Sequence, residues 1–158
     1  MSFRTGDRAE GFSLPCAPGE MVDVAAAIGS GPVVLLFFPL SYSPVCTDEF
    51  CQMRDDWSKW ESLSATVFGI SVDSPFVTSK FAAELNLPFP LLSDFNATVC
   101  KAWDVCHDDL MGLHNVAKRS AFVISPEGSI VYDWYTDDPS VQVPFDEVVA
   151  ACQAAAIC

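Results

Sequence analysis

Continuous apolar segments, typical of buried strands, alternate along this chain with segments in which apolar residues recur at helical spacing. Val33–Phe38 contains only β-branched, aliphatic and aromatic residues, and it is bounded by Gly31-Pro32 and Pro39. An uninterrupted run of this kind is typical of a central strand that is covered on both faces. Thr66–Val72 has the same character and predicts a second buried strand.

A helix is predicted after each of these two strands. The first runs from about Ser43 to Glu61, with serine as N-cap and Pro44 at the first helical position. Apolar side chains recur along it at spacings of three and four and predict one buried stripe: Phe50, Met53, Trp57 and Trp60. The second helix opens with Ser74-Pro75 and runs to about Leu85.

The rest of the chain predicts shorter elements in a definite order. They are an N-terminal hairpin over 12–23, a short extended piece at Phe89–Leu92, a short helix at Ala97–Trp103, a hairpin that joins Ala121–Ser125 to Ser129–Trp134, a surface loop over 139–144 and a last helix at Phe145–Ala155. The order βαβ, then hairpin, then helix predicts an α/β fold of the thioredoxin type. We expect a central mixed sheet flanked by helices, in one domain spanning residues 1–158.

Composition and charge restrict the partners of this protein. With 51% hydrophobic residues and a mean hydropathy of +0.29, the 158-residue chain can bury a full core. Its 21 acidic residues against 8 basic ones, a formal net charge of −13, disfavour nucleic acid and anionic membranes as partners. No apolar run approaches the roughly 20 residues of a membrane helix. Met1–Glu10 has no apolar core of a signal peptide, so we expect a cytoplasmic protein.

Seven cysteines, an odd number, indicate redox or catalytic use for some of them in a cytoplasmic protein. Cys46 stands out because it falls in the first turn of the helix after the central strand. Free backbone N–H groups and the positive end of the helix dipole favour the thiolate there, which is the nucleophilic form of cysteine. The sequence therefore predicts a nucleophile at Cys46.

Pro39-x-x-x-Ser43-x-x-Cys46 is similar to the P-x-x-x-[TS]-x-x-C signature of the peroxiredoxins. The resemblance covers nearly the whole chain in the family's order. It also rests on four further segments: Phe37–Leu40, Gly69–Ser74, Phe89–Asp94 and Lys118–Ile124, the last resembling the family's arginine segment. The resemblance implies a thiol-dependent peroxidase for hydrogen peroxide and organic hydroperoxides. It implies no cofactor, and a homodimer or a monomer.

The same resemblance implies the roles of the site residues. Cys46 is the expected peroxidatic cysteine, which becomes a sulfenic acid. Arg119, always charged and rich in fixed donors, would stabilise the thiolate and polarise the peroxide. Ser43 would donate a hydrogen bond to the peroxide or thiolate, Pro39 would limit water access, and Glu49 would orient the arginine. Two other functions stay open: a peroxide sensor or holdase that signals through Cys46, and a thioredoxin-like disulfide oxidoreductase.

Cys51 is the candidate resolving cysteine. Its spacing of five from Cys46 resembles the peroxiredoxin Q (bacterioferritin-comigratory) branch, in which the second cysteine condenses with the sulfenic acid. The segments Phe37–Leu40 and Leu91–Phe95 look more like the alkyl hydroperoxide reductase E branch, which uses one cysteine and an external thiol. A thioredoxin-like protein or a low-molecular-weight thiol is therefore the expected reductant, and both cycles remain open.

The remaining cysteines receive no catalytic role from the sequence: Cys16, Cys100, Cys106, Cys152 and Cys158. Cys16 is expected in a loop. Cys100 and Cys106 would point about 120° apart on a continuous helix and would not meet. Cys106-His107 and His114 could suggest a metal, but no zinc-type spacing accompanies them, so no metal site is expected.

Overall fold

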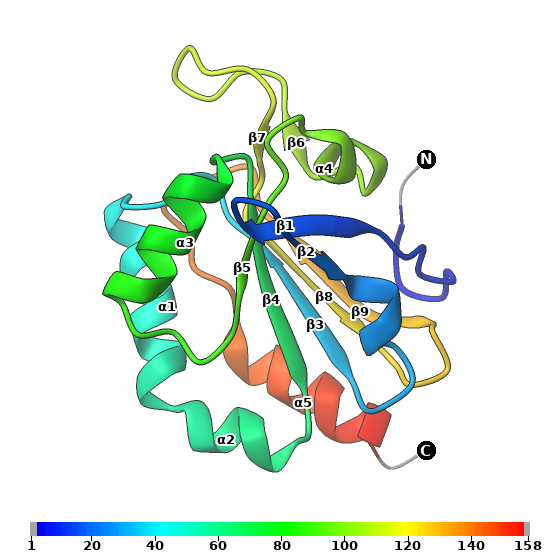
Figure 1. Cartoon of the computed structure of the whole chain (residues 1–158). Coiled ribbons are helices and arrows are strands. Elements are labelled where there is room, and N and C mark those ends of the chain that lie inside the picture. The colour runs from blue at the N-terminus through cyan, green and yellow to red at the C-terminus, as the bar shows by residue number, and fades with distance from the viewer. Residues whose placement is uncertain (1–2, 157–158) are drawn as a thin grey trace.

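Five strands form one mixed sheet in the computed structural model, which describes residues 3–156. Their order across the sheet is β5-β4-β3-β8-β9. Their bounds are Leu91–Ser93 for β5, Thr66–Ser71 for β4, Val33–Phe37 for β3, Ser120–Ile124 for β8 and Ile130–Tyr135 for β9. β3 lies at the centre, parallel to β4 and antiparallel to β8, which confirms the predicted central strand (Figure 1).

Two hydrophobic cores lie on opposite faces of this sheet because the side chains of β3 alternate between them. Val34 and Leu36 face a core that four helices cover: α1 (Pro44–Asp55), α2 (Trp57–Ser62), α3 (Pro75–Glu84) and α5 (Phe145–Ala156). Val33, Leu35 and Phe37 face the other core. That core is covered by the hairpin of β1 (Ser13–Ala17) and β2 (Glu20–Asp23), the 3-10 helix η1 (Val24–Ala27) and α4 (Thr98–Ala102). Figure 1 shows these layers, and the thioredoxin-like α/β fold is confirmed.

One long helix was predicted from Ser43 to Glu61, and this prediction is wrong because the segment forms two helices. Asp56 separates α1 from α2 with a non-helical backbone (φ −101°, ψ 21°), and it follows Asp55, in a run of residues that are poor in helix interiors. Trp60 still packs into the core against Phe145, whereas Trp57 is only half-buried and lies against Phe89. The predicted apolar stripe therefore holds for α1 and bends at the break.

Two further details differ from the prediction. Cys16 lies in β1 and not in a loop. A small antiparallel pair, β6 (Cys106–His107) with β7 (Val116–Ala117), was not predicted, because two-residue strands leave too short a pattern to read. No helix within residues 3–156 is long and apolar enough to cross a membrane.

Candidate active site

The loop after the central strand positions Cys46. Buried Pro39 follows β3, and Ser43 then precedes α1 as its N-cap (φ −71°, ψ 146°), with Pro44 at the first position. Cys46 is the third residue of the helix and is fully buried. Its thiol thus lies at the end of the helix where free N–H groups and the dipole favour an anion.

Arg119 reaches Cys46 across 73 residues of sequence. The register of the sheet explains this: Phe37, the last residue of β3, pairs with Ser120, the first residue of β8. Arg119, directly before Ser120, therefore lies beside the start of the Cys46 loop. Its Nη2 donates to the Cys46 Sγ at 3.1 Å, and the side chain is 1% exposed. A buried, permanent cation in contact with a buried thiol stabilises the thiolate.

Glu49 holds the arginine in this position. Its Oε2 accepts from Arg119 Nη1 at 2.8 Å, and neither side chain reaches solvent. Burial raises the pKa of the Glu49 carboxyl, while the Arg119 charge and a hydrogen bond from the Val143 amide act against that rise. The charged form of this carboxyl therefore depends on Arg119.

Residues 139–144, predicted as a plain surface loop, supply two backbone groups to the site. The Pro139 carbonyl accepts from Arg119 Nη2 at 3.1 Å, and the Val143 N–H donates to Glu49 Oε1 at 2.9 Å. Val143 is itself buried. The sequence could not reveal this contribution, because backbone groups are present at every residue and leave no pattern. The loop thus acts as a strap over the Glu49–Arg119 pair.

Ser43 is the N-cap by position but not through its hydroxyl. The Oγ donates to the Leu40 carbonyl at 3.0 Å, and it makes no capping bond with the helix and no hydrogen bond with Cys46. Its carbonyl accepts from both the N–H and the hydroxyl of Thr47, each at 2.9 Å. The predicted donation to the thiolate is therefore absent, and the hydroxyl would have to rotate to reach a substrate.

A partly buried network ties the Cys46 loop to β4. The Ser41 N–H donates to Asp73 Oδ2 at 2.8 Å, and the Ser71 hydroxyl donates to the same oxygen at 2.7 Å. Between Ser41 and Ser43, Tyr42 has a left-handed backbone (φ 70°), a conformation that costs about 1–2 kcal/mol for a residue with a side chain. Its ring lies 4.8 Å from that of Phe81. The hydrogen bonds to Asp73 and the ring contact with Phe81 thus hold the loop in a strained backbone conformation.

One donor in the site has no partner. Arg119 Nε is buried and finds no acceptor among residues 3–156. Unpaired buried donors are rare, since each carries a desolvation cost of about 1–3 kcal/mol. A bound substrate oxygen would satisfy it.

Cys51 lies one and a half turns after Cys46 on α1, half-buried and unpaired. Phe50, directly before it, is fully buried, and its ring lies 4.8 Å from that of Phe38. Five residues along an intact helix separate two Cα atoms by roughly 8.5 Å, beyond the about 7 Å that a disulfide allows. The helix therefore keeps the two cysteines apart in this reduced form.

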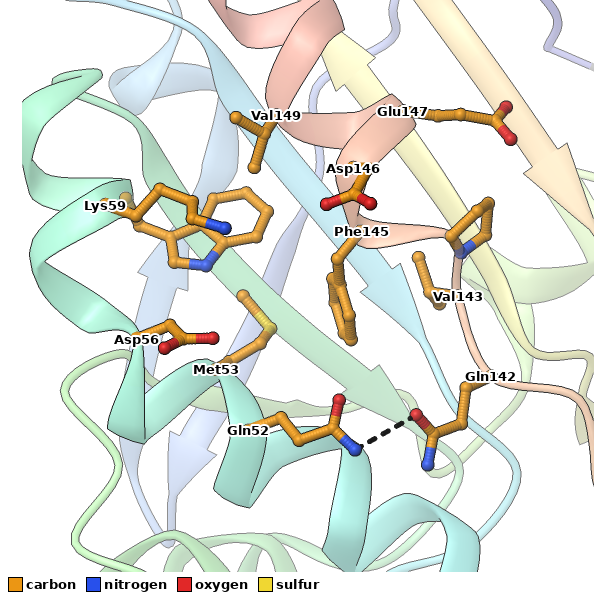
Figure 2. A pocket seen from close by; sticks show the side chains of 12 residues that line it. Gln52, Met53, Asp56, Lys59, Gln142, Val143, Phe145, Asp146, Glu147 and Val149 are labelled. Carbon is orange, nitrogen blue, oxygen red and sulfur yellow. Dashed lines mark hydrogen bonds between the residues drawn. The ribbon is translucent and has the colours of Figure 1, made fainter.

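A cavity of about 420 Å³ lies beyond the strap (Figure 2). It is bordered by the end of α1, by α2 and by the start of α5, and Gln52 Nε2 donates to Gln142 Oε1 across it at 3.3 Å. Val143 lines it, but Cys46 and Arg119 do not. The cavity is thus separate from the Cys46 thiol.

The structure also places the other cysteines. Cys152 is buried in α5, and burial raises the pKa of its thiol to about 12. Cys100 and Cys106 were expected not to meet, and this prediction is wrong. Helix α4 ends at Ala102, the chain turns back, and the two thiols interact. No group of three metal-ligating side chains occurs within residues 3–156. Cys158 lies outside the described residues.

Comparisons with known proteins show which family the chain belongs to. The AhpC/TSA family model matches residues 5–133. The chain is 38% identical over 145 residues to a putative peroxiredoxin bcp of Coxiella burnetii, covering 90% of this chain and 93% of that protein. It is 33% identical over 140 residues to peroxiredoxin Bcp of Bacillus subtilis, covering 85% of this chain and 86% of that protein.

Solved structures are similar as well. Peroxidoxin BcpB from Mycobacterium tuberculosis superposes with a TM-score of 0.85 at 31% identity, over 96% of this chain and 97% of that one. The bacterioferritin comigratory protein of Xanthomonas campestris, described for its alkyl peroxide reduction activity, gives 0.78 at 30% identity over 92% of each chain. The chain therefore belongs to the AhpC/TSA family and is a peroxiredoxin, a thiol-dependent peroxidase.

Proposed function

We propose that Cys46 is the peroxidatic cysteine and that Arg119 activates both it and the peroxide. The observation that carries this assignment is the 3.1 Å contact of Arg119 Nη2 with the Cys46 Sγ in a fully buried site. The thiolate attacks the terminal peroxide oxygen, the O–O bond breaks, and the alkoxide or hydroxide leaves as it takes up a proton. Cys46 becomes a sulfenic acid.

The other site residues position and stabilise this reaction. The unpaired Nε of Arg119 and the backbone N–H groups at the start of α1 are donors for the developing negative charge. The Ser43 hydroxyl becomes a further donor once it leaves the Leu40 carbonyl. Pro39, buried at the base of the loop, limits water access. Glu49 is a positioning residue, because its carboxylate hydrogen-bonds Arg119 and the Val143 amide of the strap, and so acts on the sulfur through Arg119.

We propose that Cys51 resolves the sulfenic acid. Its thiol attacks the Cys46 sulfur, a disulfide forms, and the hydroxyl leaves as water. A reductant of a reducing cytoplasm, either the dithiol of a thioredoxin-like protein or a low-molecular-weight thiol, then reduces the disulfide and restores both thiols. The protein works as a monomer or a homodimer in this cycle.

The resolving step requires α1 to unwind between Ser43 and Gln52. Phe50 lies between the two cysteines and packs against Phe38, Phe81 and Phe89, so unwinding removes a large aromatic side chain from the core. This loss costs about 1.5–3 kcal/mol for burial alone. The break at Asp56 confines the change to α1, since α2 is a separate helix. Oxidised and reduced proteins should therefore differ most in this segment.

Mass spectrometry after one equivalent of peroxide tests the cycle. Trypsin releases Cys46 and Cys51 in one peptide, residues 9–54, and we expect a loss of two hydrogens that maps to these cysteines. Cys16 lies in the same peptide, so Cys16→Ser is the matched control and should keep the loss. The Cys51→Ser variant should instead hold a sulfenic acid that dimedone traps.

Turnover separates the two cycles. If Cys51→Ser reduces peroxide at the wild-type rate with a thioredoxin-type reductant, Cys51 does not resolve and the one-cysteine cycle with an external thiol is correct. If Cys46→Ser retains turnover, the assignment of the peroxidatic cysteine is wrong.

A further inference from the structure

Cys100 and Cys106 lie together because helix α4 is short. The helix ends at Ala102, and the Val105 N–H donates to the Cys100 carbonyl at 2.9 Å, which turns the chain back on itself. Cys106 then begins β6, within hydrogen-bonding reach of the Cys100 thiol. Both cysteines are free. Two free thiols are thus in contact at a site that the peroxidase chemistry does not use.

A buried carboxylate accompanies this pair. Asp94, 1% exposed, accepts the Cys100 N–H at 2.8 Å and the Val99 N–H at 3.1 Å, and thereby caps the start of α4. It also interacts with the Cys100 thiol. Burial, and next the Asp94 charge, raise the pKa of Cys100, so this thiol keeps its proton at rest. The thiol itself donates to the Ala97 carbonyl at 3.6 Å, and the Asp94 carboxylate is the base beside it that is available when Cys100 reacts.

The two thiols differ in exposure. Cys100 is fully buried, whereas Cys106 is partly exposed and also makes a long contact of 3.8 Å with the His107 carbonyl. A partly exposed thiol beside a buried thiol with a nearby carboxylate resembles the working arrangement of a dithiol centre, in which the outer sulfur meets the oxidant first.

The pair is separate from the peroxidatic site. Cys100 belongs to the core on one face of the central sheet, and Cys46 belongs to the core on the other face. The sheet lies between them, so a sulfenic acid on Cys46 cannot reach Cys100 in the folded protein. Oxidation of the pair must therefore begin at its own outer thiol.

We propose that Cys100 and Cys106 are a second redox-active dithiol, which a hydroperoxide oxidises to an intramolecular disulfide. The Cys106 sulfur attacks the terminal peroxide oxygen, the O–O bond breaks, and the proton of the Cys106 thiol passes to the departing oxygen, so that an alcohol or water leaves and Cys106 becomes a sulfenic acid. Cys100 passes its proton to Asp94 and attacks the Cys106 sulfur. The S–S bond forms, and the hydroxide takes up that proton and leaves as water. One hydroperoxide is reduced by two electrons and two thiols are oxidised.

Peptide mapping of a variant without the peroxidatic pair tests this proposal. The Cys46→Ser/Cys51→Ser protein is treated with hydrogen peroxide, alkylated and digested with trypsin without reduction. Trypsin cuts after Lys101, so Cys100 lies in peptide 81–101 and Cys106 in peptide 102–118. We expect these two peptides to appear as one disulfide-linked ion, and a thiol titration of the unfolded protein to lose two thiols per chain. Reduction should restore both peptides.

Matched variants complete the test. Adding Cys106→Ser should abolish the linked ion and the loss of two thiols, whereas adding Cys16→Ser, which removes another partly exposed cysteine, should change neither. If peptides 81–101 and 102–118 remain separate and fully alkylated after excess peroxide, the proposal is wrong. If diamide links them but peroxide does not, the thiols are close enough to pair and the proposed oxidation by hydroperoxide is overturned.

Discussion

Replacing Arg119 by methionine removes the guanidinium and leaves an apolar side chain of similar length. In the folded protein this change removes the donor to Cys46 at 3.1 Å, the partner of Glu49 at 2.8 Å and the free Nε. A charge-assisted hydrogen bond contributes about 1.5–3 kcal/mol. Losing two of them in the transition state, one to the thiolate and one to the peroxide, costs about 3–6 kcal/mol. This corresponds to a second-order rate constant lower by about 10² to 10⁴.

The same substitution also affects folding, because it leaves Glu49 buried without its cation. Breaking a buried ion pair in this way costs about 3–5 kcal/mol, against a total stability of roughly 5–15 kcal/mol. Arg119→Met/Glu49→Gln removes both charges, and we expect it to recover most of the free energy of unfolding. The rate constant should remain low in this double variant, because the peroxide and the thiolate still lack their donor.

Competition with a haem peroxidase for hydrogen peroxide measures the rate constant, and urea unfolding measures stability. Arg54→Met is the matched control, since Arg54 lies on α1, the helix that carries Cys46, is partly exposed and donates to the Leu85 carbonyl. It should leave the rate constant unchanged within about twofold. If Arg119→Met reacts within twofold of the wild-type rate, or if the double variant regains activity together with stability, the proposed role of Arg119 is wrong.

Three further predictions concern the loop, the core and pH. Asp73→Ala frees the Ser41 amide, so we expect a severalfold lower rate of Cys46 oxidation, and an unchanged rate would show that the tether of the loop has no influence. Gly69→Ala places a Cβ in steric overlap with Leu91 Cδ2, and urea unfolding should show a loss of about 1–3 kcal/mol; a neutral result would mean that Leu91 moves freely. Burial first, and then the Lys118 charge, lower the pKa of His107 despite the opposing charge of Asp137, so below about pH 6.5 the unfolded chain binds a proton more readily than the folded one. The free energy of unfolding should therefore fall as the pH drops from 7.5 to 5.5, and less so in His107→Asn; equal slopes for the two proteins would contradict this.

Local patterns in the sequence predicted most of the elements. The apolar run of β3 and the Ser-Pro starts of α1 and α3 each lie within a few residues, so the sequence records them directly. The break at Asp56 was missed because periodicity continues across it, and a helix break depends on where α2 packs. The meeting of Cys100 and Cys106 was missed because it requires the exact end of α4, which patterns locate only within a few residues.

In the candidate site, too, some features follow from local sequence and others only from tertiary contacts. The sequence alone determined that Cys46 stands at a helix start after a buried strand, because proline, serine and an apolar run specify that local geometry. Only the tertiary structure decided that Arg119 contacts its sulfur, since this follows from the pairing of Phe37 with Ser120 across the sheet. It alone decided that the strap of residues 139–144 holds Glu49 and Arg119, because backbone N–H and carbonyl groups are the same at every position and gain a role only where folding places them.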